Sequence, residues 1–243
     1  MEGVMLNGER ITVIVPVYNE EKTVGGVVES ILSCDVVDEL IVVDDGSTDH
    51  TREILEDLSK DNAFHYIRFS ENKGKSYAMV AGVERAGGDI VVFVDSDLIG
   101  LKCKHIEKLV SPLLTNEADM VIGARDSKSD LGIDITKPID IWLGGERACY
   151  KKDLMPILDT VRESKFGIET LLNLYFKSKD KRIKIVNLDG LAHLKKYEKY
   201  RIDVAALNYT KATLQITKAV IDNRPLALGA LKTFLKNHSP LGV

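Results

Sequence analysis

Four short extended segments alternate with helical patterns in the first hundred residues, and this alternation limits the fold more than any other feature. The extended segments are rich in β-branched residues and span 11–17, 40–43, 65–69 and 91–94. The intervening segments, 23–32, 51–58 and 77–85, carry apolar residues at helical spacing. Strands separated by helices of this length pair in parallel through crossover connections. We therefore expect an α/β protein with a Rossmann-like, mainly parallel sheet flanked by helices.

Acidic residues follow two of these predicted strands. Asp44 and Asp45 come directly after the second strand, and Asp95-Ser96-Asp97 closes the fourth. In an extended chain residues two apart point the same way, so Asp95 and Asp97 can converge on one hard cation. Asp-x-Asp is also ordinary turn chemistry, in which the carboxylates bond the local backbone. The motif alone leaves both interpretations open.

The second half of the chain has fewer clear patterns. We expect a helix over 105–114, a short strand over 120–123, a helix opened by Gly167-Ile168-Glu169 and a strand over 183–188. Two C-terminal helices are predicted within 204–222 and 226–235. The polar segment 127–137 is either a loop that covers the site or a surface connection.

The composition narrows the class of protein. With 44% hydrophobic residues and a net charge of −4, the chain has a sizeable core and lacks the basic footprint of a nucleic-acid-binding protein. Its three cysteines are far apart, without metal-ligand spacing, which predicts reduced thiols. No signal-like segment or long uncharged apolar stretch is visible, so we expect a cytoplasmic protein.

The triplet Gly74-Lys75-Ser76 follows a predicted strand and invites comparison with a phosphate-binding P-loop. That motif needs a glycine five residues before Gly74, and Phe69 stands there. The comparison therefore fails. Lys75 either contacts a diphosphate or belongs to a solvated basic turn.

Taken together, the strand-end motifs resemble those of a known family. The residues that carry the likeness are Pro16-Val17-Tyr18-Asn19-Glu20, Val43-Asp44-Asp45-Gly46-Ser47-Thr48-Asp49, Asn72-Lys73-Gly74-Lys75 and Val94-Asp95-Ser96-Asp97. They resemble the nucleotide-sugar-binding half of family 2 glycosyltransferases. The resemblance implies the GT-A fold, a nucleoside-diphosphate sugar donor such as a UDP- or GDP-sugar, and a divalent metal, Mg²⁺ or Mn²⁺, at the Asp-x-Asp pair.

The resemblance also implies roles for individual residues. Pro16, Tyr18 and Glu20 would line the pocket for the base and ribose, and Asp45, or Asp44 beside it, would accept hydrogen bonds from the base. Asp95 and Asp97 would hold the metal, with Ser96 between them at the donor. Lys75 would contact the diphosphate.

The second half is more faintly similar to glucosyl-3-phosphoglycerate synthases and their relatives. Gly145-Glu146, Gly167-Ile168-Glu169 and His193 match those enzymes in order. The likeness implies that His193 joins the metal and that Gly145 and Glu146, with Arg125, lie at the acceptor and sugar. Glu169 would be the general base of an inverting enzyme, or would position the acceptor in a retaining one. Glu169 also suits the first turn of a helix, and His193 suits a structural role.

These expectations describe a metal-dependent glycosyltransferase that moves a sugar to a hydroxyl or phosphate acceptor. Its catalytic domain would span 1–200, divided into a donor half (9–98) and an acceptor half (99–200), with a helical extension over 201–243. Three alternatives stay open: a polyprenyl-phosphate glycosyltransferase at the membrane surface, a nucleotidyltransferase and a non-catalytic binding module. The C-terminal helices either pack on the domain or on a second subunit, or dock on anionic lipid.

Overall fold

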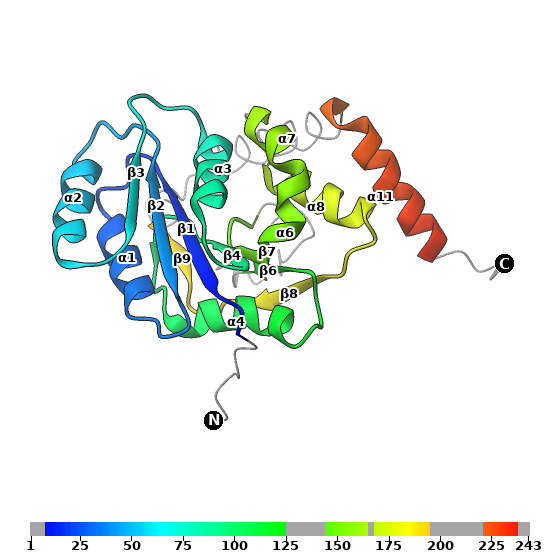
Figure 1. Ribbon diagram of the computed structural model, residues 1–243, viewed down its shortest axis with the longest axis horizontal. Coiled ribbons are helices and arrows are strands. Elements are labelled where there is room, and N and C mark those ends of the chain that lie inside the picture. Colours follow the sequence, from blue (N-terminus) through cyan, green and yellow to red (C-terminus); the bar gives the residue numbers. More distant parts are fainter. Residues whose placement is uncertain (1–7, 125–143, 165–167, 195–220, 238–243) are drawn as a thin grey trace, which may run out of the picture.

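The computed structural model describes residues 8–124, 144–164, 168–194 and 221–237 of the 243-residue chain (Figure 1). The strands are β1 (Ile11–Val17), β2 (Glu39–Asp44), β3 (His65–Arg68), β4 (Ile90–Phe93), β5 (Leu98–Ile99), β6 (Met120–Ala124), β7 (Arg147–Tyr150), β8 (Ile183–Asn187) and β9 (Ala192–His193). The helices are α1 (Val24–Leu32), α2 (Thr51–Asp61), α3 (Lys75–Arg85), α4 (Cys103–Leu114), α6 (Lys151–Leu154), the 3-10 turn η1 (Met155–Ile157), α7 (Leu158–Glu163), α8 (Ile168–Ser178) and α11 (Arg224–Asn237).

Seven strands form the main sheet in the order β3-β2-β1-β4-β7-β6-β8. All neighbouring pairs are parallel except those of β7, which runs antiparallel to both β4 and β6. The prediction of a mainly parallel sheet flanked by helices is confirmed. Because β1, β2 and β4 are parallel neighbours, their carboxyl ends, and the acidic residues after them, meet at one edge of the sheet.

Helices cover both faces of the sheet, and each face has its own apolar core (Figure 1). Alternate residues along β1 face opposite ways: Val13 and Val15 pack with α1, α2 and α4, while Ile14 packs with α3, α7 and α8. This two-sided burial is why the central strands read as continuous apolar runs.

A second, two-stranded sheet lies beside the main one and was not predicted from the sequence. β5 pairs antiparallel with β9, with Leu98 opposite His193 and Ile99 opposite Ala192. Each strand has only two residues, too few to show the alternation by which a strand is predicted. The pairing joins the chain after Asp97 to a segment almost a hundred residues later.

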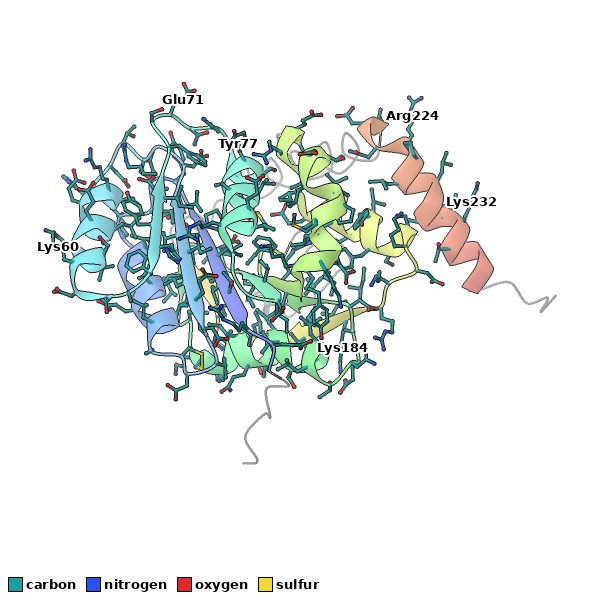
Figure 2. All side chains as sticks on the ribbon, in the orientation of Figure 1. Lys60, Glu71, Tyr77, Lys184, Arg224 and Lys232 are labelled. Atoms are coloured by element: carbon teal, nitrogen blue, oxygen red, sulfur yellow. A yellow bond between two sulfur atoms is a disulfide. The ribbon has the colours of Figure 1, made fainter. Side chains whose placement is uncertain are left out.

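The prediction of three reduced cysteines is wrong for two of them. Cys34, just after α1, forms a disulfide with Cys103 at the start of α4, and the bond is visible in yellow in Figure 2. The two helices pack on the same face of the sheet, which brings together residues 69 positions apart. Cys149 is free, and burial raises the pKa of its thiol to about 12.

The C-terminal helix α11 packs against α8 at the end of the molecule farthest from α2 (Figure 1). Gly229 of α11 lies so close to Ser178 that an added Cβ would stand 3.1 Å from its Cβ. This contact agrees with the expected packing of a C-terminal helix on the domain. Of the predicted helix over 204–222 only the last two residues are described, and the segment 127–137 and Arg125 lie outside the described residues. Among the residues that the structure describes, no helix is both long enough and apolar enough to cross a membrane.

Candidate functional site

Asp95 follows β4 and lies against the chain that enters β7. The β4–β7 register pairs Phe93 with Arg147, so Gly145 runs antiparallel past Asp95. A Cβ added to Gly145 would stand 2.2 Å from Asp95 Oδ2 and 2.6 Å from its Cγ. Because glycine has no Cβ, Gly145 lets the backbone lie close to the Asp95 carboxylate.

Asp97 contacts His193 across the small sheet. The β5–β9 register brings His193 opposite Leu98, and His193 Nδ1 lies 2.6 Å from Asp97 Oδ1. Both side chains are largely buried, with 14% and 19% of their surface exposed. A neutral imidazole that donates its Nδ1 proton to a carboxylate keeps a lone pair on Nε2, which is the arrangement of metal-bound histidines.

The turn that leads into β9 is held by α4. His105 is buried; its Nδ1 lies 3.1 Å from the backbone N of Lys102 and its Nε2 lies 3.0 Å from the carbonyl oxygen of Asp189. Burial lowers the pKa of His105, in keeping with a neutral ring that accepts at Nδ1 and donates at Nε2. Lys108 Nζ donates to the carbonyl of Asn187 and to Asp189 Oδ2. These contacts fix the turn from which His193 emerges.

Lys75 bridges two carboxylates from distant parts of the chain. Its Nζ lies 2.9 Å from Asp95 Oδ1 and 2.9 Å from Glu169 Oε1. Burial alone would lower the pKa of Lys75, but the charges of Asp95 and Glu169 outweigh it and hold the pKa above its usual range. The sequence left Lys75 open between a ligand contact and a solvated turn; the structure places its ammonium between Asp95 and Glu169, and the ligand contact stays a prediction.

Asp45 connects β2 to the start of α3. Its two carboxylate oxygens accept hydrogen bonds from the backbone N–H groups of Lys73 (2.7 Å) and Gly74 (2.8 Å). Burial raises the pKa of Asp45, although the two N–H donors act in the opposite direction. Each oxygen keeps a second lone pair for a ligand. The N-terminus of α3, which favours anions, lies beside it.

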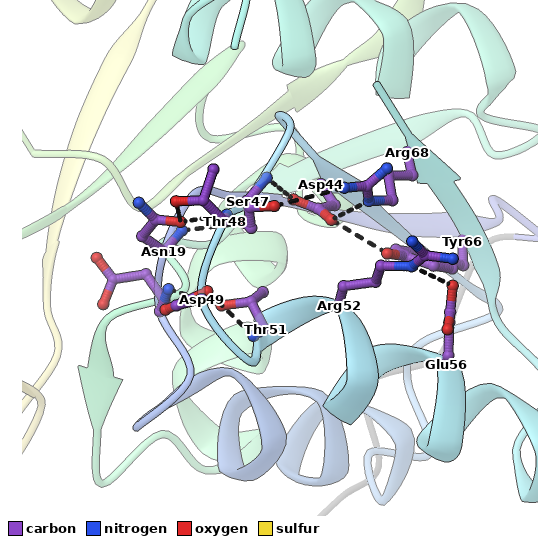
Figure 3. A network of polar contacts seen from close by, with 11 residues as sticks. Asn19, Asp44, Ser47, Thr48, Asp49, Thr51, Arg52, Glu56, Tyr66 and Arg68 are labelled. Atoms are coloured by element: carbon purple, nitrogen blue, oxygen red, sulfur yellow. Dashed lines mark hydrogen bonds and ion pairs between the residues drawn. The ribbon is translucent and has the colours of Figure 1, made fainter. Parts of the chain in front are cut away.

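Asp44 is fully buried, and Figure 3 shows its carboxylate surrounded by protein partners. It accepts hydrogen bonds from Ser47 N (2.8 Å) and Tyr66 Oη (3.1 Å), and Arg68 Nε lies 3.2 Å away. These partners tie the end of β2 to the following loop and to β3. Of the two neighbouring aspartates, Asp45 is thus the one placed for a ligand.

The residues predicted for the base and ribose pocket lie at the end of β1. Pro16 is buried within β1, Tyr18 is 44% exposed just beyond it, and Glu20 follows. The backbone N–H of Glu20 donates to Thr51 Oγ1, which joins this turn to α2. Ser96 is buried between the two aspartates after β4.

Glu146 completes a cluster that suits a divalent cation. Donor atoms of Asp95, Glu146 and His193 all lie within 4.8 Å of one another. Glu146 is only 1% exposed, and two carboxylates this close repel each other unless a cation balances them. Carboxylate oxygens with an imidazole nitrogen fit Mn²⁺ and also accept Mg²⁺. These three donors therefore fit the predicted metal, with Glu146 in the place that the resemblance gives to Asp97.

Arg147 is a member of the site that was not predicted. It is fully buried, and its guanidinium donates to the carbonyls of Gly144 and Glu169 and to Asn173 Oδ1. Burial lowers the pKa of Arg147, while the nearby carboxylates of Glu169, Asp95 and Glu146 favour its charge. Arg147 is a single arginine at the start of a four-residue strand, and nothing in the sequence there indicated that its side chain would be buried at the site.

The structure thus brings most of the predicted site residues to the same edge of the sheet. Asp95, Glu169 and Lys75 are in direct contact, and Asp97 joins them through His193. The prediction for Arg125 stays untested.

The chain is similar to known glycosyltransferases. Residues 12–189 match the family described as glycosyl transferase family 2. The glucosyl-3-phosphoglycerate synthase of Mycobacterium tuberculosis is 40% identical over 122 residues, which cover 47% of this chain and 37% of that protein. The undecaprenyl-phosphate 4-deoxy-4-formamido-L-arabinose transferase of Proteus mirabilis is 39% identical over 95 residues, 37% of this chain and 29% of that protein. The aligned stretches thus span only about a third of the length of these relatives.

Solved structures extend the likeness to the whole fold. The Mycobacterium tuberculosis synthase in complex with Mn²⁺, UDP-glucose and phosphoglyceric acid superimposes with a TM-score of 0.65 at 26% identity, covering 87% of this chain and 80% of that one. The predicted GT-A fold is confirmed by this likeness.

Proposed function

The chain belongs to glycosyl transferase family 2, and from that premise we propose that it is a metal-dependent glycosyltransferase that moves a sugar from a nucleoside-diphosphate sugar to a hydroxyl or phosphate acceptor. The observation that carries the proposal is the contact of Lys75 with both Asp95 and Glu169 beside the Asp97–His193 pair. The ammonium of Lys75 and the N-terminus of α3 would bind the diphosphate. The Asp95 carboxylate and the imidazole of His193 would bind the metal.

We propose that the donor enters over the ends of β1 and β2. Tyr18, exposed after β1, would stack on the base, and Asp45 would accept a hydrogen bond from the base through its remaining lone pairs. Pro16 and Glu20 would complete the base and ribose pocket. The solved relative with UDP-glucose supports a uridine donor as the first to test.

The metal would be held by Asp95, Glu146 and His193, whose donor atoms lie within 4.8 Å of one another. Asp97, which the resemblance names as a ligand, would orient His193 through its contact with Nδ1 and leave Nε2 to the ion. The oxygen and nitrogen donors of the cluster fit Mn²⁺ or Mg²⁺, and the relative's structure with Mn²⁺ supports a metal at this place. When bound, the ion would supply a Lewis acid that offsets the charge of the departing diphosphate. Lys75 would leave Asp95 and Glu169 to contact the same diphosphate, because a phosphate oxygen is a strong partner for an ammonium.

Glu169 would act on the acceptor side. Its carboxylate is 13% exposed and points to Lys75, so departure of the ammonium to the diphosphate would leave it able to accept a proton from an acceptor hydroxyl. In that case the reaction inverts the anomeric carbon. A retaining reaction would instead use Glu169 to orient the acceptor.

The acceptor is the least constrained part of the proposal. Relatives named for phosphoglycerate and for undecaprenyl phosphate match this chain at similar identity. Both acceptor classes should therefore be offered in the same transfer assay, with phosphoglycerate in solution and a polyprenyl phosphate in detergent.

A thermal-shift screen tests the donor and metal together. Nucleoside diphosphates and their sugars should raise the melting temperature of the protein, because such ligands bind the native state alone. The rise should require Mn²⁺ or Mg²⁺, because the ion would bind the diphosphate. Asp97→Ala should remove the metal-dependent shift. Asp57→Ala is the control, because Asp57 is an exposed aspartate of α2 whose carboxylate contacts the exposed Lys60 on the same helix.

Two outcomes would count against the proposal. Absence of any nucleotide-dependent shift in the wild type would reject nucleotide-sugar binding. An equal shift in the Asp97→Ala variant would reject a role for Asp97 in holding the metal site.

A further inference from the structure

The guanidinium of Arg147 connects the segment entering β7 with the start of α8. Its Nη2 donates to the carbonyl of Gly144 at 2.5 Å, and its Nη1 donates to the carbonyl of Glu169 and to Asn173 Oδ1, each at 3.3 Å. One side chain thus holds two segments that are more than twenty residues apart. Because Arg147 is fully buried, it touches neither solvent nor the space where a donor would lie.

Glu169 is held at two points by two different cations. Its carboxylate contacts Lys75 of α3, and its backbone carbonyl contacts Arg147 of β7. Lys75 is 41% exposed and would be drawn to a diphosphate, whereas Arg147 is enclosed and cannot leave. During a reaction that recruits Lys75, Arg147 is the contact that keeps Glu169 in place.

The charge of Arg147 also matches its surroundings. The carboxylates of Glu169, Asp95 and Glu146 all favour its charged form against the cost of burial. A buried ion retained at such a cost is held by its hydrogen bonds, and removing it strands its partners. Here the groups that lose a hydrogen bond would be two carbonyls that flank the site, those of Gly144 and Glu169.

We propose that Arg147 is a positioning residue, which sets the place of Glu169 relative to Asp95 and contacts no substrate itself. The inference rests on the proposed function, in which Glu169 faces the acceptor. It predicts that loss of Arg147 slows transfer and leaves donor binding intact, since the donor-side residues on β1 and β2 do not touch Arg147.

Hydrogen–deuterium exchange tests the structural part without any substrate. In Arg147→Met, amides of the first turns of α8 should exchange about tenfold faster than in the wild type, while those of β1 stay protected. Arg182→Met is the matched control. Arg182 also donates to a carbonyl and to an asparagine Oδ1, both of Asn116, but it lies at the other end of the sheet.

The control should leave exchange in the first turns of α8 unchanged. If Arg147→Met does not fold, Arg147→Lys carries the same test, because lysine keeps the charge but cannot span all three acceptors. Unchanged exchange in the first turns of α8 would overturn the proposal.

Kinetics test the functional part. Arg147→Met should lower kcat about 10²-fold with a donor KM within about twofold of the wild type, because a small misplacement of a reacting group has effects of that size. In a Glu169→Gln background the same substitution should lower kcat by less than about twofold, since the two residues act as one unit. Arg147→Lys should have a kcat between those of Arg147→Met and the wild type. The control Arg182→Met should have the kcat of the wild type.

Two kinetic results would contradict the proposal: independent, multiplicative losses in the double variant, or a raised donor KM with unchanged kcat. If the wild type transfers no sugar from any donor, the proposed function fails. The exchange measurement then still decides whether Arg147 positions α8.

Discussion

Replacing Gly145 with alanine tests how closely the backbone must approach Asp95. An added Cβ would stand 2.2 Å from Asp95 Oδ2, and real Cβ contacts essentially never fall below 3.0 Å, so the carboxylate must retreat by at least about 0.8 Å. That movement breaks the 2.9 Å contact with Lys75 or rotates the carboxylate away from Glu146 and His193. Because misplacement by about 1 Å can cost about 10²-fold in rate, we expect Gly145→Ala to lower kcat by about that factor.

The assay follows release of nucleoside diphosphate, with Mn²⁺ affinity measured separately on the same protein. Gly26→Ala is the matched control, because Gly26 is exposed in α1 and an added Cβ there meets nothing within 4 Å. Gly26→Ala should raise the unfolding free energy by up to about 1 kcal/mol, as expected for glycine to alanine within a helix, and leave kcat unchanged. A Gly145→Ala variant with wild-type kcat and wild-type Mn²⁺ affinity would show that Asp95 does not need this close approach of the backbone.

Three further substitutions test separate parts of the structure. Lys75→Met should lower kcat/KM for the donor about 10²-fold in steady-state assays, the usual cost of removing one group that stabilises developing charge; a change below twofold would contradict it. Cys34→Ser should lower the unfolding free energy by about 2–5 kcal/mol in denaturant titrations, because it removes a disulfide that closes a long loop. Equal stability of the wild type with and without a reductant would argue against the bond. Asp119 is partly buried, which alone would raise its pKa, but bonds from Arg182 N and Nε keep the pKa below its usual 3.8. A depressed carboxyl pKa stabilises the fold above the ordinary value and loses that effect as the pH falls, so Asp119→Asn should lower the melting temperature at pH 7 and progressively less below pH 4.

The sequence predicted the donor half of the fold well, for a clear physical reason. Three of the strands there, β1, β2 and β4, are short runs such as Ile11–Val17 that are buried on both faces, and a helix with an apolar stripe separates each strand from the next. Parallel pairing then brings the acidic residues after β2 and β4 to one edge without further information. The sequence therefore places Asp45 and Asp95 at the same edge of the sheet, as the structure does.

The acceptor half could be predicted less completely, because its contacts depend on pairings between distant segments. β7 has the sequence Arg147-Ala148-Cys149-Tyr150, which has neither an apolar run nor a clear alternation. The two-residue β9 that presents His193 to Asp97 depends on its partner β5 and on the turn held by His105. Arg147 and the Cys34–Cys103 bond are likewise products of packing, which spacing along the chain does not reveal.

The central claim is that this site cleaves a nucleoside-diphosphate sugar with the help of a divalent ion. Phosphorus NMR of the reaction with UDP-glucose, with and without Mn²⁺, and with phosphoglycerate or a polyprenyl phosphate as acceptor, tests it most directly. We expect nucleoside diphosphate as the phosphorus product, formed only with the metal and lost in Asp97→Ala. Release of pyrophosphate, or metal-independent cleavage at the same rate, would contradict it.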